Sequence, residues 1–107
     1  MSTRDAIVVL TTAGSHDEAA TIAASLVESR LAACVQIVPG VESVYWWEGR
    51  VAREAEWLLV CKTTDDRYGE VEAAIRERHS YTTPEVVAIR VDRGSASYLD
   101  WLRQSTL

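Results

Sequence analysis

Two adjacent tryptophans, Trp46 and Trp47, lie in a long apolar ribbon and restrict the fold more than any other feature of the sequence. Neighbouring side chains of a β-strand point to opposite faces of the sheet. One tryptophan can therefore face a core, whereas the other needs a second apolar surface. A chain of 107 residues has little such surface to spare, so we expect a neighbouring subunit to supply it.

The ribbon is predicted to be a hairpin of two long antiparallel strands, residues 32–47 and 50–64, joined by a tight turn at Glu48-Gly49. Pro39 interrupts the first strand, which predicts an edge strand that is bent at a bulge. Arms of more than a dozen residues would extend about 40 Å or more, farther than one small sheet can cover. Two alternatives stay open for the tryptophans, namely packing on their own domain or stacking on a ligand.

The first part of the chain predicts a strand, a loop and a helix. Residues 6–10 are continuously apolar, which is typical of a central strand covered on both faces, and residues 11–14 are expected to form a loop. Ser15 and Glu18 match a capping box, in which Glu18 reaches back to the start of a helix that should end near Arg30. Apolar residues then recur at helical spacing at Ala19, Ile22, Ala23, Leu26 and Val27.

The last part predicts a second helix over 66–78, a strand over 86–91 and a short C-terminal helix capped by Ser97, with Asp100 at its third position. The second helix places four side chains on one side, namely Tyr68, Val71, Ile75 and His79. The resulting order is β-α-β-β-α-β plus a short helix. This order predicts an α+β, ferredoxin-like split βαβ fold, with residues 1–107 forming a single domain.

Composition excludes several classes of protein. The net charge of −5 argues against binding to nucleic acid. The apolar runs are too short to span a bilayer. The N-terminus lacks the features of a signal peptide, so we expect a cytoplasmic protein. Cys34 and Cys61 lie in separate apolar runs and are expected to be reduced core thiols.

Four segments resemble, in order and at the expected spacing, the CutA divalent-cation-tolerance family: LAACVQIVPGVESVYWWEGRV, EWLLVCKTT, HSYTTPEVVAIRV and YLDWLRQ. The resemblance covers almost the whole chain. It implies a ferredoxin-like subunit and a homotrimer in which the long hairpins pair between subunits, with Trp46 and Trp47 at the interface. It also implies similarity to the trimeric PII signalling proteins, which share the fold and bind small molecules in clefts between subunits.

The resemblance implies a link to divalent metals, with copper binding in some members. Those members place a cysteine just after the first strand and two adjacent histidines at the end of the second helix. The matching positions here are Thr11, Arg78 and His79, so one donor of three is retained. His79 is therefore the candidate ligand for weakly bound Cu²⁺ or another divalent cation, and we expect no other cofactor. Its alternative is a structural role, because a helix C-terminus favours a positively charged ring.

Four further residues are candidates for a ligand cleft: Glu56, Lys62, Tyr81 and Glu85. Glu56 and Lys62 lie six residues apart on one face of a strand, about 20 Å along it, so they can share a site only between subunits. Lys62 could instead extend along the rim of the core. The loop with Tyr81 and Glu85 could equally be a simple connection whose exit Pro84 fixes.

These observations predict a binding protein for tolerance of, or response to, divalent metals such as copper. Its expected partners are copies of itself and a divalent metal or small anionic ligand, with no nucleic acid and no membrane. The alternative is a PII-like sensor in which Lys62 and Arg78 face an anion. We expect no enzyme, because no catalytic motif emerges and an acid–base pair such as Glu85 with His79 arises easily by chance.

Overall fold

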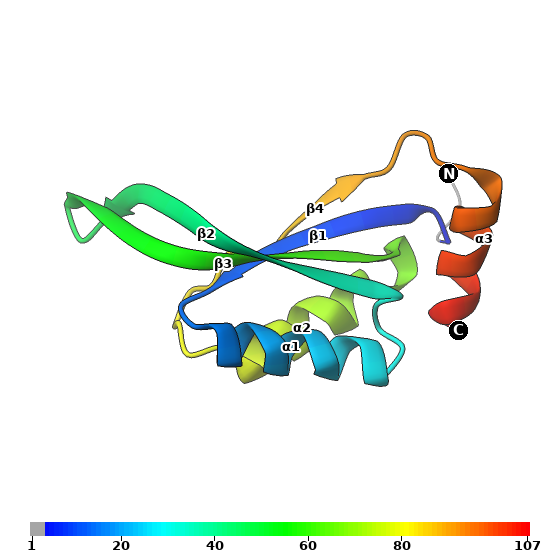
Figure 1. Ribbon diagram of the computed structural model, residues 1–107, viewed down its shortest axis with the longest axis horizontal. Coiled ribbons are helices and arrows are strands. Elements are labelled where there is room, and N and C mark those ends of the chain that lie inside the picture. Colours follow the sequence, from blue (N-terminus) through cyan, green and yellow to red (C-terminus); the bar gives the residue numbers. More distant parts are fainter. Residues whose placement is uncertain (1–3) are drawn as a thin grey trace.

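The structure is a computed structural model that describes residues 4–107, and it shows one antiparallel sheet with two long helices on one face (Figure 1). This architecture confirms the α+β, split βαβ prediction. In chain order the elements are β1 (Ala6–Ala13), α1 (His16–Glu28), β2 (Cys34–Trp47), β3 (Arg50–Thr64), the short 3₁₀ helix η1 (Asp65–Arg67), α2 (Tyr68–Arg78), β4 (Val87–Arg90) and α3 (Ala96–Ser105).

The core lies between the sheet and helices α1 and α2. The strand order is β2-β3-β1-β4, so β1 and β3 are central and carry most of the buried side chains. Val9 pairs with Cys61 on one side and with Ala88 on the other. The core cluster comprises Ile7, Val9, Ala13, Ala19, Ile22, Leu26, Ala32, Leu59, Cys61, Val71 and Ile75. Burial of these apolar side chains is the main force that holds the subunit together.

The predicted hairpin is present, and its far end projects beyond the helices (Figure 1). Glu48 and Gly49 both have positive φ, 49° and 79°, as the tightest two-residue hairpin turns require. The ladder shifts register between Val38 and Val41, so Pro39-Gly40 forms the expected irregularity in an edge strand. At the tip, Trp46 is 74 % exposed. One subunit therefore leaves this tryptophan without an apolar surface to cover it.

The second face of the sheet is open over much of its area, contrary to the expectation that the first strand is covered on both faces. Register places Val8 beside Lys62 and Leu10 beside Val60 on this side. Helices α1 and α2 both lie on the other side (Figure 1), so these side chains are only half-buried. We call the apolar surface the open face; it consists of Val8, Leu10, Val38, Leu58, Val60, Val87 and Ile89.

The first half of the chain differs from the sequence-based boundaries at two points. The predicted loop at residues 11–14 is wrong, because β1 continues to Ala13, which pairs with Trp57. The first helix ends at Glu28 rather than near Arg30, which adopts a positive φ of 60°. A long partner strand therefore extended the pairing of β1 beyond its apolar run.

Three boundaries also differ in the second half. The segment 65–67 is a 3₁₀ turn, so α2 begins only at Tyr68. The last strand is shorter than predicted, Val87–Arg90. The cap of α3 is Ser95, whose hydroxyl accepts from the Tyr98 N–H, and not Ser97. Serine is a favourable N-cap residue at either position, so the sequence alone does not decide between Ser95 and Ser97.

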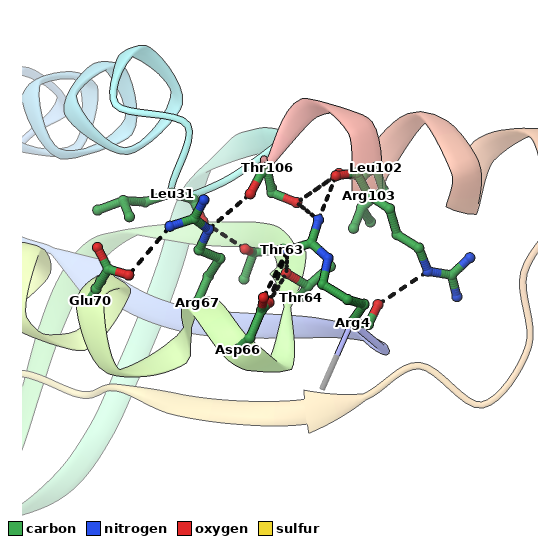
Figure 2. A network of polar contacts seen from close by, with 10 residues as sticks. All are labelled: Arg4, Leu31, Thr63, Thr64, Asp66, Arg67, Glu70, Leu102, Arg103 and Thr106. Carbon is green, nitrogen blue, oxygen red and sulfur yellow. Dashed lines mark hydrogen bonds and ion pairs between the residues drawn. The ribbon is translucent and has the colours of Figure 1, made fainter. Parts of the chain in front are cut away.

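Helix α3 is tied to the start of β1 by a polar network (Figure 2). The Arg4 guanidinium donates to the Arg103 carbonyl, to the Thr106 hydroxyl and to the Asp66 carboxylate. Arg67 donates from Nε to the Thr106 carbonyl at 2.8 Å. Thr106 is fully buried. Charge-assisted bonds of this kind orient the last turn of α3 as well as hold it, so the C-terminal helix has one defined position across the end of the sheet.

Asp66 makes this network sensitive to acid. Burial raises the pKa of its carboxyl, but hydrogen bonds from Thr64 and Arg4 and the charges of Arg4 and Arg67 outweigh burial and lower the pKa below the usual 3.8. A lowered folded-state pKa stabilises the fold above the unfolded-state pKa, and this contribution disappears as the pH falls through the folded-state value. We expect Asp66→Asn to lower the free energy of unfolding at pH 7 by about 1 kcal/mol, since the pair is partly exposed.

The difference between Asp66→Asn and wild type should shrink below about pH 4, which urea unfolding at pH 7 and at pH 3 will measure. The matched control is Asp92→Asn, because Asp92 is exposed and its ion pair is with its own chain neighbour, the equally exposed Arg93. A stability difference for Asp66→Asn that is equal at both pH values would contradict this account of the network.

The two cysteines lie on opposite faces of the sheet. Cys34 pairs with Lys62 on the side of the open face, and Cys61 pairs with Val35 inside the core. Both are free thiols. Burial, with a smaller contribution from Cys34, raises the pKa of the Cys61 thiol to about 12, so Cys61 stays protonated and unreactive at neutral pH. Cys34 is only half-buried in the subunit.

Candidate functional site

His79 is the centre of a polar cluster where α2 ends. Its side chain has no exposed surface. Nε2 lies 2.6 Å from the Thr12 carbonyl oxygen of β1, and Nδ1 accepts the Tyr81 N–H at 3.1 Å. A carbonyl oxygen can only accept, so Nε2 carries the proton and the ring is the neutral Nε2–H tautomer. The ring thus joins the end of α2 to β1 and to the connection that follows.

Glu18 belongs to this cluster, contrary to the expectation that it reaches back to cap its own helix. Ser15 does cap α1 by accepting the Glu18 N–H at 3.1 Å. The Glu18 carboxylate instead lies with Oε1 3.5 Å from His79 Nδ1. This oxygen is buried and has no hydrogen-bond partner within residues 4–107. A buried polar atom without a partner costs free energy and is uncommon in folded proteins.

Tyr81 and Glu56 extend the cluster to β3. The Tyr81 hydroxyl donates to Glu56 Oε2 at 2.8 Å, and Glu56 is buried. Burial, the hydrogen bond to Glu56 and the charge of Glu56 raise the pKa of Tyr81, with smaller contributions from Tyr45 and Glu18. The phenol therefore stays neutral and remains a donor. The Tyr81 and His79 rings are also in contact, with centroids 4.6 Å apart.

The structure brings together three of the predicted site residues, Glu56, His79 and Tyr81, and places the others elsewhere. Lys62 lies near the C-terminal end of β3, six residues beyond Glu56, with Nζ 5.5 Å from the centroid of the Tyr98 ring of α3. Glu85 is exposed on the connection before β4.

Thr11, Arg78 and His79 do not form a copper site within one chain. Both nitrogens of His79 are bonded to the backbone. Arg78 ion-pairs with Glu77 at 3.6 Å and adds positive charge beside any cation. No group of three or more potential donor side chains suited to a metal occurs within residues 4–107. A tight site normally needs three or four ligands, so these residues do not fit the copper chemistry that the resemblance implies for them.

Comparison with known proteins agrees with the fold and with the resemblance. The sequence profile described as "CutA1 divalent ion tolerance protein" matches residues 7–105. The chain belongs to the CutA divalent ion tolerance family. It is 48 % identical over 99 residues to the "Divalent-cation tolerance protein CutA" of Thermus thermophilus, a match that covers 92 % of this chain and 96 % of that protein.

Solved CutA structures superpose closely on the subunit. The CutA1 crystal structure from Oryza sativa gives a TM-score of 0.94 at 42 % identity, covering 98 % of this chain and 96 % of the other. The structure named "Periplasmic divalent cation tolerance protein CutA" from Archaeoglobus fulgidus gives 0.93 at 38 % identity, covering 95 % and 99 %. No helix within residues 4–107 of this family member is long and apolar enough to cross a membrane.

Sequence reasoning missed Glu18 and the Thr12 carbonyl as parts of the cluster. Thr12 and His79 are 67 positions apart, so no local pattern links them. Glu18 carried a local signal that pointed to a different role, because Ser15 and Glu18 have the spacing of a capping box. The second histidine, His16, is exposed at the start of α1.

Proposed function

We propose that this CutA family member acts in tolerance of divalent cations as a cytoplasmic homotrimer that binds a small ligand between its subunits. The proposal is for a binding role and includes no reaction. One observation carries it: the subunit has a complete core on one side of its sheet and an uncovered apolar surface on the other.

The open face supports assembly. It is a contiguous apolar surface on four strands, and exposed patches of that kind mark protein interfaces. Through Val87 and Ile89 the open face reaches the edge strand β4. A further apolar feature is the exposed hairpin tip, where Trp46 and Val51 pair. Unpaired edge strands bind other chains readily. The proposal of three subunits comes from the resemblance to the family, whereas the surfaces that would be buried between them are identified from this structure.

The ligand-binding part of the proposal rests on Glu56, Tyr81 and Lys62. Glu56 lies in the middle of β3 and Lys62 near its C-terminal end, and they contact different partners, so one chain cannot bring them to one ligand. Subunits that pair through the open face and the hairpins would place Lys62 of one chain near Glu56 of another. A cleft with a carboxylate, a phenol and an ammonium group suits a small polar ligand or a weakly held divalent cation.

A specific observation favours the PII-like sensor as the second candidate. Lys62 lies on the side of the sheet that carries the open face, and Tyr98 of α3 lies beneath its ammonium group. A lysine held against an aromatic ring is positioned as well as charged, so it can recognise an anion. In this alternative, anions should stabilise the wild-type protein against heat and should not stabilise Lys62→Met.

Growth in raised copper tests the proposed function. In a bacterium that lacks its own CutA protein and has become copper-sensitive, we expect the wild-type chain to restore growth. His79→Gln should restore growth equally, because its amide can still donate to the Thr12 carbonyl and no copper ligand is lost. Failure of the wild-type chain to restore growth would contradict the proposed function.

Calorimetric titration of Cu²⁺ into the reduced proteins separates direct binding from an indirect effect. We expect wild type and His79→Gln to give the same weak heats, with His16→Gln as the matched control. A stoichiometric micromolar signal that disappears only in His79→Gln would show that His79 is a copper ligand, contrary to the geometry of its ring.

A further inference from the structure

The position of the Lys62 ammonium group depends on helix α3. Lys62 is the only lysine of the chain, and its Nζ lies over the Tyr98 ring, 5.5 Å from the centroid. Tyr98 belongs to the first turn of α3. A cation within about 6 Å of an aromatic face is attracted by the negative face of the ring. The direction in which Lys62 can meet a ligand therefore changes if α3 moves.

Apolar packing alone does not fix the orientation of α3. Leu102 is the only buried residue among residues 96–105, and the two aromatic side chains of the helix, Tyr98 and Trp101, are exposed. The connection that leads into α3, residues 91–95, contains no helix or strand. A helix with a single buried side chain can rotate about that side chain, so polar contacts must define its orientation.

The Arg4 guanidinium joins the last turn of α3 to β3 (Figure 2). Its Nη1 donates to the Thr64 hydroxyl at 3.0 Å. Its Nη2 donates to the Thr106 hydroxyl at 3.0 Å and to the Arg103 carbonyl. Thr64 and Thr106 are both completely buried, and a planar guanidinium holds its donors in a fixed geometry. One side chain therefore sets how the end of the helix lies against the strand.

The Arg4 contact and the Lys62 contact involve the same face of β3. Thr64 lies two residues beyond Lys62 on this strand, so both side chains point to one face. On the helix, Tyr98 and the C-cap residue Thr106 are eight residues apart, about 12 Å along the axis. Helix α3 is thus attached to β3 near both of its ends. A displacement at the Arg4 end would be transmitted through two helical turns to the Tyr98 ring.

We propose that Arg4 is a positioning residue for Lys62, because it fixes the last turn of α3 and so determines where the Tyr98 ring lies beneath the ammonium group. The location of Arg4 suits this role, since a helix C-terminus favours a cation and Asp66 holds the guanidinium at 3.0 Å. Recognition of a small anion by Lys62 rests on the proposed function. The position of Lys62 does not, and it can be measured without a ligand.

Nuclear magnetic resonance of the full-length protein with ¹³C-labelled lysine tests the proposal, because a single lysine gives a single ε-methylene signal. In the wild type the Tyr98 ring current should displace this signal upfield of its position in Tyr98→Leu. We expect Arg4→Met to lose most of the displacement. A wild-type signal equal to that of Tyr98→Leu, or an Arg4→Met signal equal to that of the wild type, would overturn the proposal. Failure of anions to stabilise the wild type would contradict the sensor function alone.

Three further variants separate positioning from a general loss of stability. Thr106→Val keeps the bond of Arg4 to Thr64 and removes the hydroxyl that Arg4 reaches on α3, so it should also reduce the displacement. Arg93→Met changes an exposed arginine of the connection before α3 and should keep the wild-type signal. Ile22→Val weakens the core at a buried residue of α1 and should keep it too. A Lys62 signal that moves alike in Thr106→Val and Ile22→Val would overturn the proposal.

Discussion

Replacing Val60 with aspartate is expected to convert a particle of about 36 kDa, three times the 11.9 kDa subunit, into single chains. Val60 lies on the central strand β3, pairs with Leu10 and forms the middle of the open face. In a trimer, each carboxylate would be buried in apolar surroundings without a partner. An unpaired buried charge costs several kcal/mol. Each of the three subunits would contribute one such carboxylate, so the assembly would be destabilised three times over.

Light scattering gives the mass, and circular dichroism shows whether the subunit stays folded. The matched control is Val27→Asp, the same change at a valine that is 41 % exposed on α1, on the covered side of the sheet. This control should keep the full mass. A wild-type mass near one chain, or a full-size particle for Val60→Asp, would contradict the proposed assembly. If the trimer is needed for function, Val60→Asp should also fail to restore growth in copper.

The hairpin and the exposure of its tryptophans could be predicted because both depend on residues that are close together in the sequence. Glu48-Gly49 between two apolar arms leaves few turns available, and Pro39 cannot take a full part in a ladder. The structure confirms the turn, the bulge and the edge position. The adjacent tryptophans also indicated correctly that one subunit does not cover both of them, since Trp46 and Trp47 are exposed.

The candidate site could be predicted only as separate residues. Glu56, His79 and Tyr81 were identified by type and position, but their mutual contacts depend on how β1, β3 and the end of α2 pack. The same packing turned Glu18 from a helix cap into the neighbour of His79. The separation of Lys62 from Glu56, in contrast, followed from their six-residue spacing on β3. Local spacing contains no information on the contacts of His79 with Thr12 and of Tyr81 with Glu56, because these join residues that are 67 and 25 positions apart.

Alternate side chains of β3 point to the core and to the open face, but the sequence pattern does not distinguish these two faces. Leu58, Leu59 and Val60 form one apolar run, which reads equally well as a strand buried on both faces or as one that faces a core and a subunit interface. In the structure Leu59 is completely buried against the helices, whereas Leu58 and Val60 are half-buried on the open face. Neighbouring leucines therefore have different roles, and their substitution separates the two surfaces.

Leu59→Ala is expected to lower the free energy of unfolding by about 2–5 kcal/mol per chain, because it leaves a cavity in the core beneath α1 and α2. The matched control is Leu58→Ala, the same change one position away on the open face. Leu58 should affect assembly instead, so Leu58→Ala should dissociate at a higher protein concentration than wild type. Leu59→Ala should follow the wild-type dilution curve as long as it remains folded.

Urea unfolding and mass measured across a dilution series distinguish these effects. If Leu58→Ala and Leu59→Ala change both measurements alike, then the open face and the core are not separate surfaces, and the assembly argument built on Val60 fails with them. If only Leu59→Ala lowers subunit stability and only Leu58→Ala weakens the particle, then one strand supplies the core with one set of side chains and the interface with the next. That division would be the physical basis on which a subunit of 107 residues assembles with its neighbours.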